Sequence, residues 1–166
     1  MQPNFATTVP SSSIAPAEGW CEVRAHQRVV RYRRIGDGAA PMLLLLDGGF
    51  PIAFWPDLAR ALATSFRVVV PDLSSGRNDA ATVMRCLLDG LGASGVAVIA
   101  SGPYCGVAVA LAAGDEEQVG SLVLVSDDDI PNESPVPLLV LSGHLSLDGA
   151  LVRIHRFLRG GLPAGR

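Results

Sequence analysis

Charge is scarce in this sequence, and neither sign dominates. Acidic and basic residues make up 17% of the 166 positions and the formal net charge is -3, so the chain has no basic field that would attract a nucleic acid. Arginines gather between residues 24 and 34, but they alternate with apolar residues, which is typical of the solvated face of a strand. We therefore expect no nucleic-acid partner.

Cysteines and cofactor motifs are also rare. The chain has 3 cysteines, an odd number, and Cys86 and Cys105 lie in apolar helical patterns. This favours buried, reduced thiols in a cytoplasmic protein over a disulfide framework. No Walker-type GKS/T sequence, complete GxGxxG or zinc-ligand spacing occurs, so we expect neither a cofactor nor a resident metal.

Uninterrupted apolar stretches are short. LLLL at 43–46 has the length of a strand, far below the roughly 18 residues of a membrane helix. Residues 1–18 are rich in Ser, Thr and Pro and have neither a basic start nor an apolar core, so they resemble no secretory signal or transit peptide. We expect a disordered tail over 1–18, one domain over 19–160, a short tail over 161–166 and no membrane contact.

Apolar patterns of strand type and helix type alternate along the predicted domain. Continuous apolar runs such as 42–46 indicate parallel strands that helices cover on both faces, whereas the first two strands should pair antiparallel. The alternation, with its short connections, predicts an α/β protein with a mainly parallel, doubly wound sheet flanked by helices. We expect strands near 20–25, 28–34, 42–46, 67–70, 96–100, 122–125 and 138–141, and helices near 55–64, 78–91, 104–113 and 148–158.

The stretch VAVIASGPYCGVAVALAA at 96–113 is the centre of this pattern. It reads as a short buried strand, a turn marked by Gly and Pro, and a helix that is apolar on nearly every side. We expect this helix to be buried all round and the turn before it to expose its tip.

Several landmarks around this stretch resemble the α/β-hydrolase family, in the branch of esterases, epoxide hydrolases and dehalogenases. The resemblance covers about residues 20–158 and implies an α/β-hydrolase-like fold. It also implies that the family's cap and one terminal strand are missing, because only residues 127–136 separate Ser126 from Pro137. The landmarks are DGGFP at 47–51 followed by Trp55, VVVPDL at 68–73, Leu91-Gly92 before the central strand, LVLVS at 122–126 and PVPLLVLSG at 135–143.

In that family, the turn after the central strand is a nucleophile elbow of the form G-x-S-x-G. Here Gly102 takes the nucleophile's place and Pro103 the next one, whose N–H should help to hold the oxyanion; after a one-residue slip, Pro103 itself replaces the nucleophile. Asp47 replaces the histidine that opens the family's HG loop and would repel the developing negative charge. The elbow is therefore degenerate. We expect ester hydrolysis to be lost and Gly102 to adopt a backbone conformation closed to other residues.

Four side chains that follow expected strands remain as candidate catalytic groups: Asp47, Ser101, Asp127 and His144. Ser101, expected at an exposed turn, could replace the missing nucleophile. Cys105 is a weaker substitute, because a buried thiol without a cationic neighbour stays protonated. His144 follows a glycine before the last helix, as the family's catalytic histidine does, and an ordinary loop histidine is the alternative.

Asp127 lies after the sixth expected strand, where some members of the family carry the acid of the triad. It begins the run Asp127–Asp129, and three neighbouring carboxylates could also hold a hard cation. A solvated loop is the plain alternative, because no second spaced acidic motif accompanies the run.

Three functions remain open. The first is a pseudoenzyme, a binding or accessory module that contacts a protein partner or a second copy through an exposed sheet edge, with room for a small apolar or acyl ligand. The second is a lyase, isomerase or cyclase that acts on an acyl or polyketide-like substrate with Asp47 and His144 as acid-base groups. The third is residual esterase activity through Ser101. Convergence of the four candidate groups would favour an enzyme, and scatter would favour a module.

Overall fold

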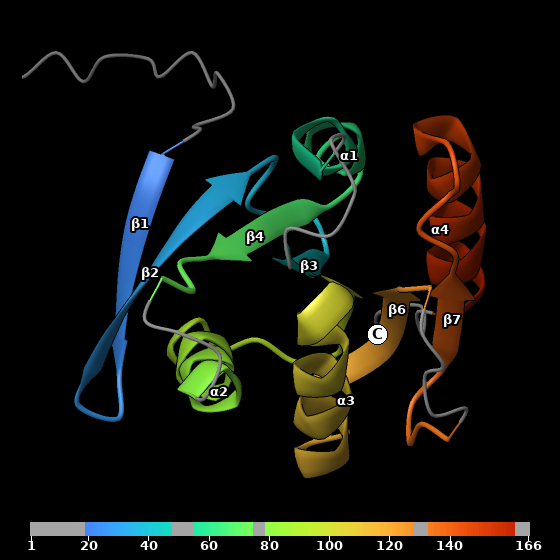
Figure 1. Cartoon of the computed structure of the whole chain (residues 1–166). Helices are drawn as coiled ribbons and strands as arrows, with labels where there is room; N and C mark the ends of the chain where they lie inside the picture. Colours follow the sequence, from blue (N-terminus) through green and yellow to red (C-terminus); the bar gives the residue numbers. More distant parts are fainter. Residues whose placement is uncertain (1–18, 48–54, 75–78, 128–132, 162–166) are drawn as a thin grey trace, which may run out of the picture.

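The structure is a computed structural model that describes residues 19–47, 55–74, 79–127 and 133–161 (Figure 1). Seven strands form one sheet. They are β1 (Gly19–Ala25), β2 (Arg28–Ile35), β3 (Met42–Leu46), β4 (Arg67–Pro71), β5 (Val96–Ser101), β6 (Val119–Val125) and β7 (Leu138–Leu141). The helices are α1 (Trp55–Leu62), α2 (Ala80–Gly90), α3 (Cys105–Gly114) and α4 (Leu147–Gly161), and a short 3-10 turn, η2 (Gly102–Tyr104), precedes α3.

The strand order is β1-β2-β4-β3-β5-β6-β7. β2 pairs antiparallel with both β1 and β4. The remaining pairs, β4-β3, β3-β5, β5-β6 and β6-β7, are all parallel. The predicted mainly parallel sheet with an antiparallel start is confirmed. Because parallel strands end at the same edge of a sheet, the loops that follow β3, β5, β6 and β7 all begin at that edge.

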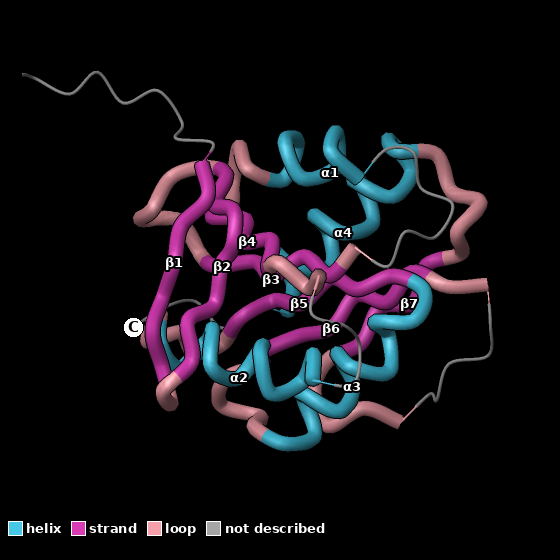
Figure 2. The backbone as a smooth tube through the Cα atoms, turned by 60° about the vertical axis from the view of Figure 1, so that its left-hand side comes forward, coloured by secondary structure: helices cyan, strands magenta, loops and turns pink. Residues whose placement is uncertain are grey.

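Helices cover both faces of the sheet, α2 and α3 on one and α1 and α4 on the other (Figure 2). Successive side chains of a strand point to opposite faces, so β3 sends Leu44 and Leu46 under α2 and α3 but Leu43 and Leu45 under α1 and α4. All four are at most 2% exposed. The continuous apolar run therefore belongs, as predicted, to a strand buried on both faces.

The prediction that α3 is buried on nearly every side is wrong. Cys105, Ala108, Leu111 and Ala112 are buried, whereas the outward positions, such as Ala110, are exposed. A helix packed on a sheet presents only one stripe to it. The outward residues of α3 are mostly small, so leaving them in water sacrifices little hydrophobic free energy.

The bounds of β6 and α4 are among those that differ most from the prediction. β6 begins at Val119, before the predicted start at residue 122, because Gly120 and Ser121 interrupt the apolar pattern without interrupting the strand. Gly120 lies where a side chain would not fit: a Cβ there would come within 2.9 Å of the Gly95 carbonyl oxygen. α4 extends beyond the predicted range at both ends.

The described sheet ends at β7, which pairs only with β6. Residues 126–137 connect these two strands, so the connection is too short for a cap domain, as predicted. The predicted tails at 1–18 and 162–166 lie outside the described residues. In the part of the chain that is described, no helix combines the length and the apolar character needed to cross a bilayer.

The turn between β2 and β3 passes close to the backbone at the end of α1, and the point of contact is Gly36. Gly36 follows β2 with φ of +94°, and a Cβ on it would lie 2.5 Å from the carbonyl oxygen of Phe66 and 2.7 Å from that of Ala63. Both oxygens belong to backbone, which cannot rotate away as a side chain can. The turn from β2 to β3 therefore passes the end of α1 only because residue 36 has no side chain.

Gly36→Ala should therefore destabilise the fold by about 2 kcal/mol or more, because it combines a left-handed alanine with a backbone clash. Gly38→Ala is the matched control two positions further along the same turn, where nothing lies within 4 Å of the place that a methyl group would take and φ is not in the left-handed region. We expect the control to stay within about 0.5 kcal/mol of wild type in a urea titration. Equal stability of the two variants would contradict the close approach.

Candidate functional site

The four candidate groups follow four adjacent strands. Asp47 comes directly after β3, Ser101 is the last residue of β5, and Asp127 and His144 follow β6 and β7. These strands are neighbours in the order β3-β5-β6-β7, so the four residues lie along the same edge of the sheet. Whether they act together depends on their side chains.

The elbow itself has the shape expected of a strand-to-helix turn. β5 ends at Ser101, the chain reverses through Gly102 with φ of +49°, and Pro103 lies in the first turn of η2. The left-handed conformation predicted for Gly102 is confirmed. A residue with a Cβ would be strained there, and neither Gly102 nor Pro103 carries a nucleophilic side chain.

Ser101 does not lie at an exposed turn, so that prediction is wrong. β5 runs one position further than expected, and Ser101 remains extended beside Val125 of β6. Its side chain shares the face of Ala97 and Ile99, the face under α1 and α4, and the residue is 0% exposed. A substrate therefore has no route to its hydroxyl group in this conformation.

Cys105, the weaker nucleophile candidate, lies on the opposite face of the sheet. It is 6% exposed, and its Sγ atom lies 3.6 Å from the Ala100 carbonyl oxygen and 3.7 Å from that of Val125. These are contacts of a thiol that donates to backbone acceptors. They fit the predicted buried, structural thiol.

Asp127 and His144 form the one contact among the four candidates that the described side chains define. Asp127 Oδ1 accepts a 3.0 Å hydrogen bond from the Ser142 hydroxyl and a 2.9 Å bond from the Gly143 N–H, and Oδ2 lies 3.6 Å from His144 Nε2. The Gly143 and Ser142 donors, and then His144, hold the pKa of Asp127 below its ordinary value. Asp127 thus fastens the loop after β7 to the end of β6.

This pair is open to water. The side chain of His144 is 86% exposed and that of Asp127 is 30% exposed. A histidine so exposed is not packed on the enclosed Ser101, so the arrangement lacks the nucleophile-base contact of a catalytic triad. Asp128 and Asp129 lie outside the described residues, and in the ranges that are described no three metal-binding side chains come together.

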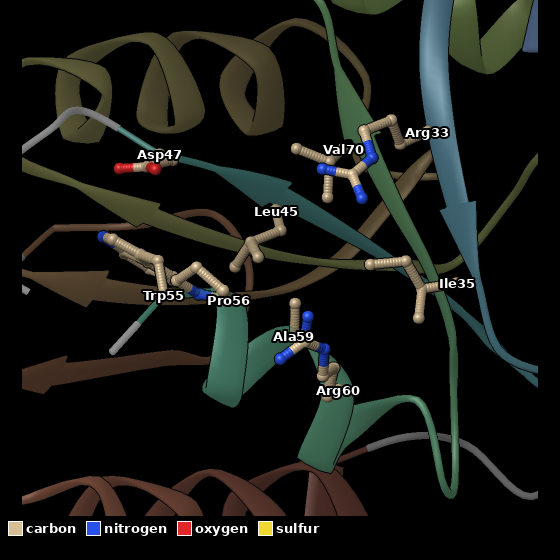
Figure 3. A pocket seen from close by; sticks show the side chains of 9 residues that line it. All are labelled: Arg33, Ile35, Leu45, Asp47, Trp55, Pro56, Ala59, Arg60 and Val70. Atoms are coloured by element: carbon tan, nitrogen blue, oxygen red, sulfur yellow. The ribbon is translucent and has the colours of Figure 1, made fainter. Parts of the chain in front are cut away.

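Asp47 belongs to a different neighbourhood, a pocket of about 150 Å³ between α1 and the sheet (Figure 3). β5 and β6 separate its strand from β7, and three strand spacings of about 4.8 Å place the β3 and β7 ends about 14 Å apart. Asp47 and His144 therefore do not face a common small substrate group. The residues that line the pocket are Arg33, Ile35, Leu45, Asp47, Trp55, Pro56, Ala59, Arg60 and Val70.

Sequence patterns gave no indication of most of this pocket. Arg33 reads as one of several arginines on a solvated strand face, and Trp55 reads only as a landmark of the family resemblance. The one available signal is that Trp55, a residue with a polar N–H, occupies a position that must face the core. The other two histidines lie elsewhere: His26 contacts Asp89 at 2.7 Å, and His155 lies against Phe66.

No family model matches this sequence, and no curated protein is significantly similar to it. Solved structures do match. A loop variant of the haloalkane dehalogenase DbeA from Bradyrhizobium elkanii shares 23% identity with a TM-score of 0.55, over 66% of this chain and 40% of that one. The carboxylesterase CesB from Bacillus subtilis shares 22% identity with a TM-score of 0.54, over 66% of this chain and 43% of that one.

The epoxide hydrolase VrEH1 from Vigna radiata matches with 22% identity and a TM-score of 0.56, over 72% of this chain and 43% of that one. All three are α/β-hydrolase-fold enzymes, so the chain has the α/β-hydrolase fold, as the sequence resemblance implies. It spans less than half the length of these structures. Sequence identities below 25% support a shared fold but do not show a shared activity.

Asp127→Asn should lower the melting temperature at neutral pH and flatten its fall in acid. Because the folded pKa of Asp127 is lowered from 3.8, its ionised form stabilises the fold above that pH, and this stabilisation disappears as the pH falls through the lowered pKa. The difference in melting temperature between wild type and variant should stay constant from about pH 7 to pH 5 and disappear in stronger acid. Glu116→Gln, an exposed carboxylate between α3 and β6, is the control. A melting-temperature difference that is the same at every pH would show that the charge of the Asp127 carboxylate does not stabilise the fold.

Proposed function

We propose that this chain is an α/β-hydrolase-fold protein that does not hydrolyse esters and acts as a binding or accessory module. The elbow carries the proposal. Gly102 occupies the place of the nucleophile, and Pro103 follows it with no N–H to donate to an oxyanion. The loss of one oxyanion donor alone lowers kcat by about 100-fold to 1,000-fold in enzymes that retain their serine.

The surroundings of the elbow support the same proposal. Asp47 is an exposed carboxylate that follows β3, the strand next to β5, so it adds a negative charge to the edge of the sheet at which the elbow lies. A negative charge on this edge disfavours an anionic intermediate at the elbow. The Asp127-His144 pair, in turn, is engaged in holding the loop after β7 and faces water.

The two enzymatic alternatives are less well supported. A lyase or isomerase that uses Asp47 and His144 would need both groups on one substrate, yet two strands lie between their positions. An esterase that uses Ser101 would need access to a side chain that is fully buried. Hydrolysis is nevertheless the activity that an experiment must look for, because the structural neighbours are named as a dehalogenase, a carboxylesterase and an epoxide hydrolase.

The partner we propose is a second copy of the chain, paired through β7. The residues of β7 are LLVL, so this edge of the described sheet has no charge and no proline, the features that usually prevent strands from pairing between molecules. Val140 is 43% exposed there, although its strand neighbour Leu124 is buried. Antiparallel pairing of β7 with its own copy would cover Val140 in both chains around a two-fold axis.

Gly102→Ser tests the loss of hydrolysis. Serine at a φ of +49° should destabilise the fold by about 1–3 kcal/mol and yield no activity on p-nitrophenyl acetate, because Pro103 still cannot donate. Gly106→Ser is the matched control, since Gly106 lies on the exposed side of α3 with nothing within 4 Å of its Cβ position. Ester turnover by wild type, or by Gly102→Ser, would overturn the proposed function.

Val140→Lys tests the partner. We expect light scattering after size-exclusion chromatography to give the mass of a dimer for wild type and of a monomer for the variant, because a lysine on β7 blocks edge pairing. Val152→Lys is the control, since Val152 is 59% exposed on α4, away from the strand edge. A monomeric wild type, or equal dissociation by both variants, would exclude pairing through β7.

A further inference from the structure

The outer side of α4, the helix beside β7 in Figure 1, carries a row of arginines. Successive residues of an α-helix are about 100° apart around its axis. Arg156 follows the fully buried Ile154 by two positions, so it points to the side opposite the core. Arg153 and Arg159 lie three positions before and after Arg156, and all three arginines are exposed. They form a cationic row about 9 Å long on the surface of the molecule.

The described residues do not balance this charge. None of the three arginines forms an ion pair with a described residue. Asp148, in the first turn of α4, is the last acidic residue of the sequence, so no carboxylate lies one helical turn from any of them. The helix dipole favours a cation in the last turn, as at Arg159, but does not account for Arg153 and Arg156 in the middle of the helix.

Charge is divided unequally along the sequence as well. The chain has 13 basic and 16 acidic residues, yet residues 149–166 contain four of the basic residues and none of the acidic ones. Residues 1–148 therefore have a net charge of -7, and residues 149–166 one of +4. Such asymmetry is a feature of chains that contact nucleic acids or membranes.

Exposed acids lie away from the arginine row. Asp115, Glu116 and Glu117 follow α3, a helix that packs on the opposite face of the sheet from α4 (Figure 2). An anionic surface that approaches α4 meets the arginines first. Salt screens the repulsion from these more distant carboxylates more strongly than the attraction at contact.

One apolar side chain lies within the arginine row. Val152 is 59% exposed and precedes Arg156 by one helical turn. A bilayer interface suits this combination, because guanidinium groups bind lipid phosphates while an apolar side chain reaches the boundary of the acyl chains. A nucleic acid suits it less well: no exposed position that is described in α4 is aromatic, so bases have no ring to stack on.

We propose that the outer side of α4 binds the surface of a membrane that contains anionic phospholipids. Arg153, Arg156 and Arg159 contact lipid phosphates, and Val152 enters the headgroup region, while the buried stripe of α4 stays in the protein core. This departs from the expectation of no membrane contact, which rested on the lack of a long apolar run; binding at the surface needs no such run. The site is separate from the elbow and from β7, so it does not depend on the proposed function.

Co-sedimentation with sucrose-loaded vesicles tests the proposal. The full chain should pellet with phosphatidylcholine vesicles that contain about 30% phosphatidylglycerol and stay in solution with phosphatidylcholine alone. Each arginine near an anionic surface strengthens binding about fivefold, so three should raise the affinity about 100-fold over neutral vesicles. Sodium chloride at about 1 M should release the protein, because the Debye length is then only about 3 Å.

Arg156→Gln and Arg85→Gln form the matched pair of variants. Each removes one positive charge from an exposed arginine in the middle of a helix, but Arg85 is on α2, on the other face of the sheet. We expect Arg156→Gln to weaken binding to the anionic vesicles about fivefold and Arg85→Gln to leave it within about twofold of wild type. Circular dichroism of each variant shows whether it is folded.

Val152→Ser distinguishes a membrane from other anionic surfaces. It should weaken vesicle binding about twofold to fivefold, because the apolar contact is lost while the charge stays the same. Vesicle binding that Val152→Ser leaves unchanged would overturn the membrane assignment, as would tighter binding to a DNA duplex of about 20 base pairs at the same salt concentration. Equal binding to neutral and anionic vesicles, no binding to either, or equal weakening by Arg156→Gln and Arg85→Gln would also overturn the proposal.

Discussion

β3 and β5 have neighbours on both edges and helices over both faces, so their backbone N–H and C=O groups and all their side chains are enclosed. This enclosure is the constraint on which the rest of the structure depends. It requires a continuous apolar sequence in each strand and a helical layer on each face. It also confines every polar group with a chemical role to the ends of the strands, because a charge within either strand would be buried without water.

The carboxyl edge of the sheet shows how these polar groups divide. Asp127 uses both of its oxygens to fasten the loop after β7, and this explains an acidic residue there without any catalytic demand. Asp47 faces the α1 side, among arginines and an indole. Neighbouring strands thus bring candidate catalytic residue types to one edge, while their side chains belong to separate environments. Position along an edge is a weaker indication of a site than a shared cavity.

The fold was predictable from the sequence because buried strands leave an unmistakable pattern of short, continuous apolar runs between helical ones. The errors have local physical causes. Along α3 nearly every residue is apolar, so the sequence carries no periodicity from which the buried stripe could be found. The burial of Ser101 follows from the extension of β5 to that residue, where it pairs with Val125 of β6, and the local sequence does not encode this pairing. The pocket remained hidden because Arg33 and Trp55 come from segments that meet only in three dimensions.

The two apolar cores, one on each face of the sheet, share no side chains, because each strand residue points to one face only. A change in the packing of α2 and α3 can reach the α1 pocket only through displacement of the sheet backbone, and seven hydrogen-bonded strands resist such displacement. Substitutions on the two faces should therefore combine nearly additively. In evolutionary terms the molecule consists of two faces that can diverge independently: the packing on one face can change while the other stays as it is.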